Sequence, residues 1–307
     1  MRIGFAVPVS GPWATPDNQA EVARRAEDLG YHSLWTFQRL LYPVDDANPR
    51  WIPPYREVID PLVSLGFLAG VTSRARLGVA VLNLPWFSPL LLAKQAAAVD
   101  VLSGGRLDLG IGLGWSREEY AATGVPFTGK GARAEEFLRC LHALWGEPPV
   151  SFDGELWQVP PSYVAPRPVQ RPGPPVIVGG FAPAALERAG RLADGWVSSA
   201  RADLSVIGKS VQTVKDAAAE AGRDTDALRF VCRGVVRLRE SPGASDRRPL
   251  TGTLDEVRAD LDDLAAQGIT ETFVDLNFDA EVGGPDADPR ASMARAHEAL
   301  EALAPGR

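Results

Sequence analysis

The chain has 307 residues, of which 45% are hydrophobic and 23% charged, the composition of an ordinary folded protein. Its formal net charge of −7 argues against a general nucleic-acid-binding surface. No run of about 18 apolar residues occurs, and the first residues enter a strand pattern rather than a signal peptide. Together with two distant cysteines, Cys140 and Cys232, these features predict a cytoplasmic protein without membrane segments or a disulfide framework.

Apolar, β-branched runs alternate with amphipathic helical patterns along the whole chain. We expect strands at residues 2–8, 33–37, 76–83, 106–111, 175–179, 195–199, 229–238 and 270–276. We expect a helix after each strand, at residues 16–29, 57–71, 89–102, 131–145, 183–192, 204–221, 254–267 and 291–303. Eight strand–helix units without a long linker predict a single (β/α)8 TIM-barrel domain spanning residues 1–307. A doubly wound sheet is disfavoured, because no glycine-rich phosphate loop follows the first strand.

The length beyond a minimal barrel falls in three connections, which we expect to form loop insertions at the C-terminal face. Leu40–Arg56 is rich in proline and aromatic residues and is the candidate substrate lid. Residues 150–174 begin with a hairpin pattern and continue into a proline-rich segment. Residues 240–249 are polar, and we expect that segment to be mobile.

Glycines alternate at the end of the fourth predicted strand, at Gly110, Gly112 and Gly114, and Trp115 follows them. Glycine weakens a strand, so this pattern predicts backbone that lies close to something flat or bulky. Active sites of TIM barrels lie at the carboxyl ends of the strands. The other candidate residues at these ends are Gln38, Arg39, Tyr42, Ala80, Val81, Asn83, Gly179, Gly180, Ser198 and Ser199.

An anion site is predicted at Gly179-Gly180, because bare amides precede a helix that has Pro183 in its first turn. A plain strand–helix turn explains the same residues about as well. Arg39 suits a carboxylate or phosphate through its planar fork, although a surface arginine is the alternative. The three histidines fall in helices or at a strand entrance, so we expect structural roles for them, and no metal-binding motif is present.

Six blocks of sequence, in the same order along the chain, carry a resemblance to a known family. They are residues 26–35, 77–83, 91–106, 110–115, 175–180 and 193–197. The chain resembles the bacterial luciferase-like superfamily, and within it the actinobacterial oxidoreductases that use the deazaflavin coenzyme F420. The resemblance implies a barrel with the cofactor ring in its mouth and a small organic molecule as substrate.

The resemblance also implies roles for several strand-end residues. A non-prolyl cis peptide would back the ring; the matching pair is Ala80-Val81, with Leu82 or Asn83 as the alternative, and Gly112, Gly114 and Trp115 would lie beside the ring. Gly179 and Gly180 would hold the cofactor phosphate, with Ser198 and Ser199 alongside. The F420 tail is polyanionic, and Arg167, Arg171 or Lys209 are the residues expected to reach it.

In similar sugar-phosphate dehydrogenases a histidine follows the second strand and a glutamate follows the fourth. The matching positions here hold Arg39 and Trp115. Arg39 stays protonated and cannot act as an ordinary base, so we expect it to bind substrate. Proton delivery is left to water bound by Gln38, to Tyr42, or to solvent.

Three functions remain open at this point. The first is an F420-dependent oxidoreductase that transfers a hydride, for example to an activated alkene or imine. The second is an FMN-dependent monooxygenase of the same superfamily. The third is a non-catalytic flavin-binding barrel, which the missing acid–base residues permit but the retained glycines disfavour. Similar proteins are often homodimers packed through early helices, and the apolar segment 58–71 suits such a surface.

Overall fold

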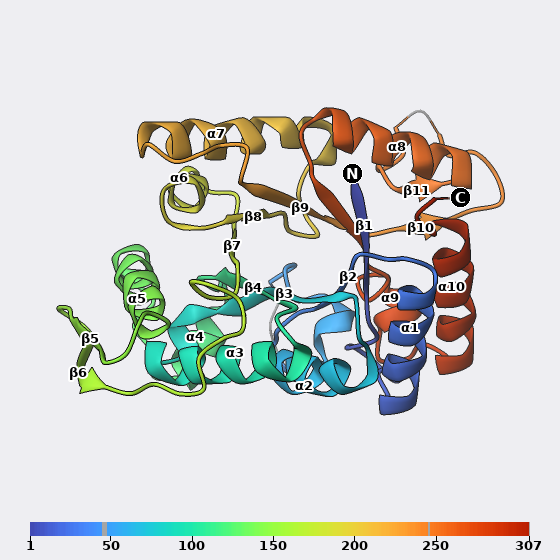
Figure 1. Cartoon of the computed structure of the whole chain (residues 1–307). Coiled ribbons are helices and arrows are strands. Elements are labelled where there is room, and N and C mark those ends of the chain that lie inside the picture. The colour runs from blue at the N-terminus through green and yellow to red at the C-terminus, as the bar shows by residue number, and fades with distance from the viewer. Residues whose placement is uncertain (45–47, 245, 307) are drawn as a thin grey trace.

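The computed structural model describes residues 1–44, 48–244 and 246–306. Within these residues, eight parallel strands close into a barrel in the order β1-β12-β9-β8-β7-β4-β3-β2 (Figure 1). The barrel strands are β1 (Arg2–Ala6), β2 (Ser33–Thr36), β3 (Arg76–Asn83), β4 (Leu107–Gly112), β7 (Val176–Gly179), β8 (Gly195–Val197), β9 (Arg229–Gly234) and β12 (Glu271–Val274). The predicted (β/α)8 TIM barrel is therefore confirmed.

Helices cover the outside of the barrel, with α7 and α8 along one side and α2 and α3 along the opposite side (Figure 1). The covering helices are α1 (Pro16–Asp28), α2 (Pro61–Val71), α3 (Pro89–Ser103), α5 (Lys130–Leu144), α6 (Pro183–Leu192), α7 (Ile207–Glu220), α8 (Leu254–Ala266) and α10 (Pro289–Ala302). Two short helices, α4 (Arg117–Ala122) and α9 (Ala280–Gly283), lie in loops. None of the helices in the described ranges is long and apolar enough to cross a membrane.

Local capping chemistry sets the helix boundaries and corrects some predicted ones. The second helix was expected from residue 57 but begins at Pro61, because Asp60 accepts hydrogen bonds from the amides of Leu62 and Val63. The last helix begins at Pro289, where Asp288 caps the amide of Ala291. Proline at the first helical position needs no amide partner, which explains both starts.

Three further predictions of secondary structure were wrong in detail. The seventh strand ends at Gly234 instead of continuing to residue 238, and the chain then forms β10 (Arg237–Leu238). This short strand pairs with β11 (Thr251–Gly252), which the sequence did not suggest. A 3-10 turn at Leu204–Val206 precedes α7, which therefore begins later than expected. Position 245, within the segment expected to be mobile, lies outside the described residues.

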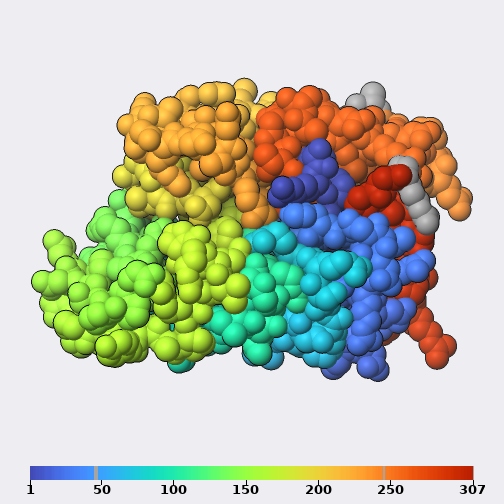
Figure 2. Space-filling model, in the orientation of Figure 1, coloured from blue at the N-terminus to red at the C-terminus, as the bar shows by residue number. Residues whose placement is uncertain are grey.

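The predicted hairpin is confirmed as β5 (Val150–Asp153) paired with β6 (Gln158–Ser162), beside α5 (Figure 1). Its expected place at the C-terminal face was wrong. Residues 145–175 connect the end of α5 to the start of β7, so this insertion belongs to the amino-terminal side of the barrel. In the space-filling view it is yellow-green and covers part of one flank (Figure 2).

The barrel interior is filled by its own side chains, so a ligand can enter only at an end. The inner cluster consists of Ala6, Trp35, Ala80, Ile177, Val197, Val231 and Phe273. Trp35 stacks on Phe273 with ring centroids 4.9 Å apart. At the amino end, Asp108 is fully buried and forms ion pairs with Arg76 and Arg229. This ionic floor leaves the carboxyl end as the open side of the barrel.

Candidate functional site

The third strand carries an irregularity where the cofactor ring was expected. Its pairing with β4 shifts register between Val79 and Leu82, and the Ala80–Val81 peptide bond is cis. The cis bond is the one that the resemblance implied, and it is confirmed. Val81 is partly exposed and packs on the top of the inner cluster, at the barrel mouth.

The strand-end glycines are required by this part of β3. A methyl group on Gly112 would lie 2.6 Å from Cγ2 of Val81, and one on Gly179 would lie 2.9 Å from Cγ1. A methyl group on Gly110 would lie 1.8 Å from the carbonyl oxygen of Val79. The bulky object that the glycine pattern predicted is therefore, in the first place, the protein's own third strand. The side chain of Val81 fits between two bare backbones and presents its remaining surface at the mouth.

A buried arginine that the sequence analysis missed supports this irregularity from below. Arg233 is 5% exposed, forms a 2.7 Å ion pair with Asp275, and donates a hydrogen bond to the carbonyl oxygen of Ala80. Its guanidinium lies 4.6 Å from the ring of Phe278. The strand-seven end was expected near Arg237, so Arg233 was assigned to the strand interior.

Gln38 and Asn83 are both buried and join the ends of β2 and β3. Oε1 of Gln38 accepts hydrogen bonds from the backbone amide and from Nδ2 of Asn83, at 2.9 and 3.3 Å. Gln38 thus positions the segment that follows Val81. Its predicted role in holding a water molecule would fall to its amide nitrogen, because the oxygen is already committed.

Arg39 and Glu119 form a buried ion pair directly above these residues. Nη1 of Arg39 lies 2.8 Å from Oε2 of Glu119, and the two side chains are 8% and 0% exposed. Oε1 of Glu119 accepts a hydrogen bond from the amide of Leu40. Burial raises the pKa of Glu119, although Arg39 and the amides of Leu40 and Leu41 act in the opposite direction.

The matched position after the fourth strand holds Trp115, but a carboxylate that was not among the predicted residues, Glu119, reaches Arg39. It lies four residues beyond Trp115, the matched position, and belongs to the unpredicted helix α4. Ser116 caps that helix by accepting a hydrogen bond from the amide of Glu119. The pattern Ser-x-x-Glu was the sequence signal for a helix start and was overlooked.

Aromatic rings enclose the guanidinium of Arg39. It lies 4.7 Å from the ring of Tyr55, 4.8 Å from Trp115 and 5.5 Å from Trp51. Tyr42 packs edge-on against Trp51, with centroids 5.6 Å apart. Among the described residues, neither Nε of Arg39 nor Nε1 of Trp51, both buried, has a hydrogen-bond acceptor. A ligand with an acceptor atom would satisfy donors that the protein leaves open.

The predicted lid forms a strap across the barrel mouth. It leaves the end of β2, and the carbonyl of Pro49 accepts a 2.6 Å hydrogen bond from Arg201. Arg201 follows β8, which lies opposite β2 in the closed strand order. Trp51, which belongs to this segment, is buried against Trp115. Residues 45–47 of this segment lie outside the described residues.

The expected phosphate site lies at the ends of β7 and β8. Ala182, which has no side chain able to cap, precedes α6, so the first amides of this helix lack a side-chain partner. Gly180 has φ +139° and its carbonyl accepts a hydrogen bond from Nε1 of Trp196. Ser199 is partly exposed beside this turn, whereas Ser198 is buried and bonded to the amide of Arg233. Of the two serines, Ser199 has the accessible hydroxyl.

Three cations, Arg50, Arg117 and Lys130, gather at the rim around Trp115. None of them was among the residues predicted for the site. Nζ of Lys130 lies 3.2 Å from the carbonyl oxygen of Gly114 and 4.2 Å from the ring of Phe127. Burial lowers the pKa of Lys130, and the charges of Arg117 and Arg50 lower it further. No carboxylate in the described ranges lies within 4.0 Å of these three charges. A rim of like charges favours an anionic ligand.

The residues expected to reach a cofactor tail are split between the two ends of the barrel. Arg167 pairs with Glu147, and Arg171 bonds to the carbonyl of Pro168. Both arginines precede β7 and therefore lie on the amino-terminal side, away from the mouth. Lys209 lies in the first turn of α7, on the mouth side.

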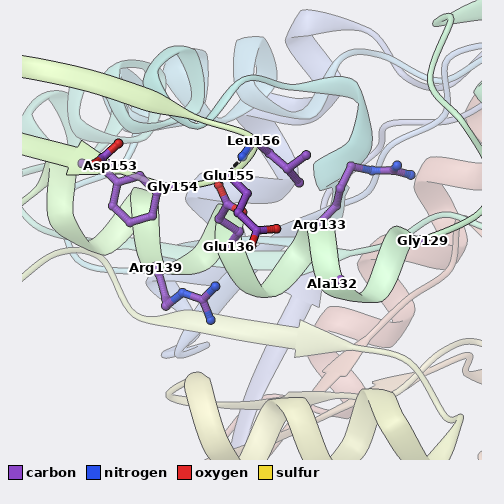
Figure 3. Close-up of a pocket in the computed structure, with 10 residues that line it drawn as sticks. Gly129, Ala132, Arg133, Glu136, Arg139, Asp153, Gly154, Glu155 and Leu156 are labelled. Atoms are coloured by element: carbon purple, nitrogen blue, oxygen red, sulfur yellow. Dashed lines mark hydrogen bonds between the residues drawn. The ribbon is translucent and has the colours of Figure 1, made fainter.

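A groove of about 820 Å³ lies away from the barrel mouth, between α5 and the β5–β6 hairpin (Figure 3). Glu136 crosses it and accepts hydrogen bonds from the amides of Leu156 and Trp157, which fix the hairpin turn to the helix. Burial alone would raise the pKa of Glu136, but these backbone donors outweigh it and lower the pKa. The groove is thus built by a structural contact and contains none of the strand-end residues.

Comparison with known proteins agrees with this geometry. Residues 2–248 match the family described as "Luciferase-like monooxygenase". The chain belongs to that family. An uncharacterised protein of Mycobacterium tuberculosis is 36% identical over 73% of this chain and 80% of its own length. The FMNH2-dependent dimethylsulfone monooxygenase of Pseudomonas putida is 32% identical over 57% of this chain and 47% of its own.

Two solved structures superpose on nearly the whole length of this chain. The monooxygenase RslO1 of Streptomyces bottropensis covers 99% of both chains, with a TM-score of 0.79 and 25% identity. The coenzyme F420-dependent tetrahydromethanopterin reductase of Methanopyrus kandleri covers 98% of both chains, with a TM-score of 0.75. At 19% identity the second likeness supports the fold alone. The family therefore places this chain among luciferase-like oxidoreductases and monooxygenases, with F420-dependent and flavin-dependent neighbours.

Proposed function

We propose that this protein is a coenzyme F420-dependent oxidoreductase that moves a hydride between the deazaflavin ring and a small organic substrate. The observation that carries the proposal is the buried Arg39–Glu119 pair in its aromatic enclosure, beside the exposed surface of Val81. This arrangement places one oriented, charged group among aromatic rings at the carboxyl end of the barrel. A non-catalytic barrel has no need of such a pair, because a buried ion pair contributes little to stability.

The residues present fit a planar cofactor at the barrel mouth. Val81 would back the ring, with Ala80 and Asn83 in the same strand, and the backbone of Gly112 and Gly114 would lie along its edge. The fit rests on Val81, whose side chain is held between the bare backbones of Gly112 and Gly179 and is partly exposed at the mouth. The ring supplies hydride chemistry when bound, and the protein supplies orientation.

The cofactor phosphate is proposed to lie at the uncapped start of α6. The backbone amides that follow Gly179 and Gly180 belong to the N-terminus of α6. Free amides and the helix dipole at that end favour an anion. Ser199 adds a hydroxyl, and Lys130 adds a positive charge from the rim above Gly114. Ser198 takes no direct part in this arrangement, because its hydroxyl already serves β9.

Arg39 is proposed to bind the electron-rich group of the substrate. Its free Nε can donate to a carbonyl, carboxylate or imine nitrogen, and the positive charge stabilises the negative charge that hydride addition creates. Glu119 holds the guanidinium in place through Nη1. Trp51 and Trp115 pack around the guanidinium and shield it from water, which strengthens this interaction. Tyr42, a water molecule held by the amide group of Gln38, and solvent are the candidate sources of the accompanying proton.

An FMN-dependent monooxygenase is the second candidate. It is favoured by the 32% identity to the FMNH2-dependent dimethylsulfone monooxygenase, which exceeds the identity to the F420-dependent reductase. The same residues would receive the flavin ring and its phosphate. The two candidates differ in the reductant and in the need for molecular oxygen.

The test is turnover with each reduced cofactor. Reduced F420 is mixed anaerobically with a panel of conjugated alkenes, imines and ketones, and the absorbance of oxidised deazaflavin is followed. We expect at least one acceptor to be reduced by the wild-type protein and not by Arg39→Met. Oxygen-dependent product formation with reduced FMN, and none with F420, would establish the second candidate instead.

We also propose that the protein forms a homodimer through α2 and α3. Val63 and Phe67 on α2, and Leu90, Leu91 and Leu102 on α3, are exposed apolar side chains. The two helices contact each other and lie side by side on one flank (Figure 1). A joint apolar surface of this kind is typical of a protein–protein interface.

A further inference from the structure

A second, smaller pocket opens beside Ser199, between the connection from β8 to α7 and the approach to β11. Its volume is about 370 Å³. It is lined by Arg201, Ala202, Asp203, Leu204, Arg248 and Pro249. These residues follow β8 and β9, so the pocket lies on the mouth side of the barrel, next to the proposed phosphate site.

Two arginines give this pocket a positive character. Arg201 and Arg248 are exposed, and each donates one hydrogen bond to a backbone carbonyl, that of Pro49 or of Ala200. Neither has a carboxylate within 4.0 Å in the described part of the chain. A guanidinium has five N–H donors, so most of those in the pocket are left for a ligand.

Lys209 adds a third positive charge near the pocket. Hydrogen bonds from Ser205 lower the pKa of Asp203, and the charge of Lys209 lowers it further. Asp203 is the acidic residue of the lining, and Ser205 already occupies one of its carboxylate oxygens. In a chain with a formal net charge of −7, three cations around one acid form a local site for an anion.

We propose that this pocket binds the oligoglutamate tail of F420, a proposal that rests on the F420-dependent function above. The tail is a flexible chain of carboxylates joined to the cofactor beyond its phosphate. From a phosphate at Ser199, the chain would reach Arg201, two residues further along the same connection, and Arg248, which precedes β11 and donates a hydrogen bond to the carbonyl of Ala200. The guanidinium fork matches a carboxylate in geometry as well as in charge.

This assignment gives the pocket a role in choosing the cofactor. FMN ends at its phosphate and has no group to place between the two arginines. The pocket therefore adds affinity for F420 alone, while the ring and phosphate sites serve both cofactors. Because the charges are exposed, the added affinity decreases as salt concentration rises.

The experiment compares two natural forms of the cofactor, one with several glutamates and one with the phosphate but no glutamate. Their dissociation constants are measured by tryptophan fluorescence quenching at low and high salt, for the wild type, Arg248→Gln, Arg201→Gln and Arg24→Gln. Arg24 is exposed on α1, so its variant changes net charge equally but leaves the pocket intact. We expect the tail to tighten wild-type binding about three- to tenfold at low salt, from two exposed ion pairs.

In Arg248→Gln and Arg201→Gln the preference for the tailed form falls towards one, whereas Arg24→Gln keeps it. The form without glutamates binds the wild type, Arg248→Gln and Arg24→Gln alike. Arg201→Gln also loses the hydrogen bond to Pro49, so for this variant only the ratio of the two affinities is compared. Equal affinity of the wild type for both forms overturns the tail site but leaves the proposed function standing. Failure of both forms to bind overturns the proposed function together with the tail site.

Discussion

Nη1 of Arg39 and Oε2 of Glu119 lie 2.8 Å apart in a site from which solvent is excluded, and no other ion pair in the described ranges lies against the aromatic rings of the strap. Arg39 lies three residues after the end of β2, and Glu119 belongs to the short helix α4, which follows β4. The pair therefore links the loops that follow β2 and β4, which β3 separates in the barrel, and fixes the guanidinium that faces the proposed substrate position.

Arg39→Met is expected to destabilise the fold by about 3 kcal/mol at neutral pH, because it leaves the Glu119 carboxylate buried without its counter-charge. The double variant with Glu119→Gln should recover most of that loss. Urea unfolding measures both. Arg50→Met, at the exposed rim, is the matched control and should unfold like the wild type. A double variant as unstable as Arg39→Met alone would contradict a coupled pair.

The pH dependence of stability should carry the signature of Glu119. Burial raises its pKa above the ordinary value of 4.5, so the folded state holds the proton more tightly than the unfolded state does. The contribution of this group to the free energy of unfolding is therefore full below pH 4.5 and is lost as pH rises through the folded pKa. The free energy of unfolding of the wild type, minus that of Glu119→Gln, should decrease as pH rises across this range. An increase would show that Arg39 outweighs burial.

Gly112→Ala is expected to cost about 1–3 kcal/mol, because its methyl group would lie 2.6 Å from Val81. Removing the two methyl groups of Val81 should relieve the clash, so Gly112→Ala with Val81→Ala should be more stable than the sum of the single losses predicts. Thermal unfolding of the four proteins gives the coupling energy. Additive losses would mean that Val81 is not what requires the glycine.

Arg233→Met is expected to destabilise the protein by about 3–5 kcal/mol and to weaken cofactor binding. It leaves Asp275 buried without its counter-charge and removes the donor to the carbonyl of Ala80. Arg233→Lys keeps the charge but cannot hold both partners, so its stability should be intermediate. Denaturant unfolding and cofactor titration are read together. Wild-type stability in Arg233→Met would contradict the supporting role.

Phe67→Asp is expected to convert a dimer into monomers, because it places a charge in the middle of the apolar α2–α3 surface. Sedimentation velocity at several concentrations measures the change. Leu156→Asp, on the exposed hairpin turn, is the control and should sediment like the wild type. A monomeric wild type, or a dimeric Phe67→Asp, would place any interface elsewhere.

The order of strands and helices was predictable from the sequence, because apolar periodicity reports which face of each element is buried. Strand ends were not predictable to the residue. Arg233 was missed because the residues after it continue a strand-like pattern, whereas the chain turns away after Gly234. Backbone pairing with neighbours decides such a boundary, and the local pattern does not contain it.

The site was predictable in outline and not in its charges. The glycines correctly marked the mouth, but their closest neighbour is Val81 of the same protein. Glu119 was missed because a comparison of positions along the chain does not show that the short helix α4 carries a side chain back towards β2. The pairing of Arg39 with Glu119 joins the loops after β2 and β4, and that of Arg201 with Pro49 joins the loops after β8 and β2. Only the folded barrel brings these loops together.

The most direct measurement is a parallel titration of the purified protein with oxidised F420 and with FMN, read by quenching of its tryptophan fluorescence. Trp51 and Trp115 at the mouth would report a ring bound against Val81. The account predicts F420 binding at least about tenfold tighter than FMN binding, a difference of about 1.4 kcal/mol. Tight binding of FMN with none of F420 would contradict it and establish the flavin-dependent candidate.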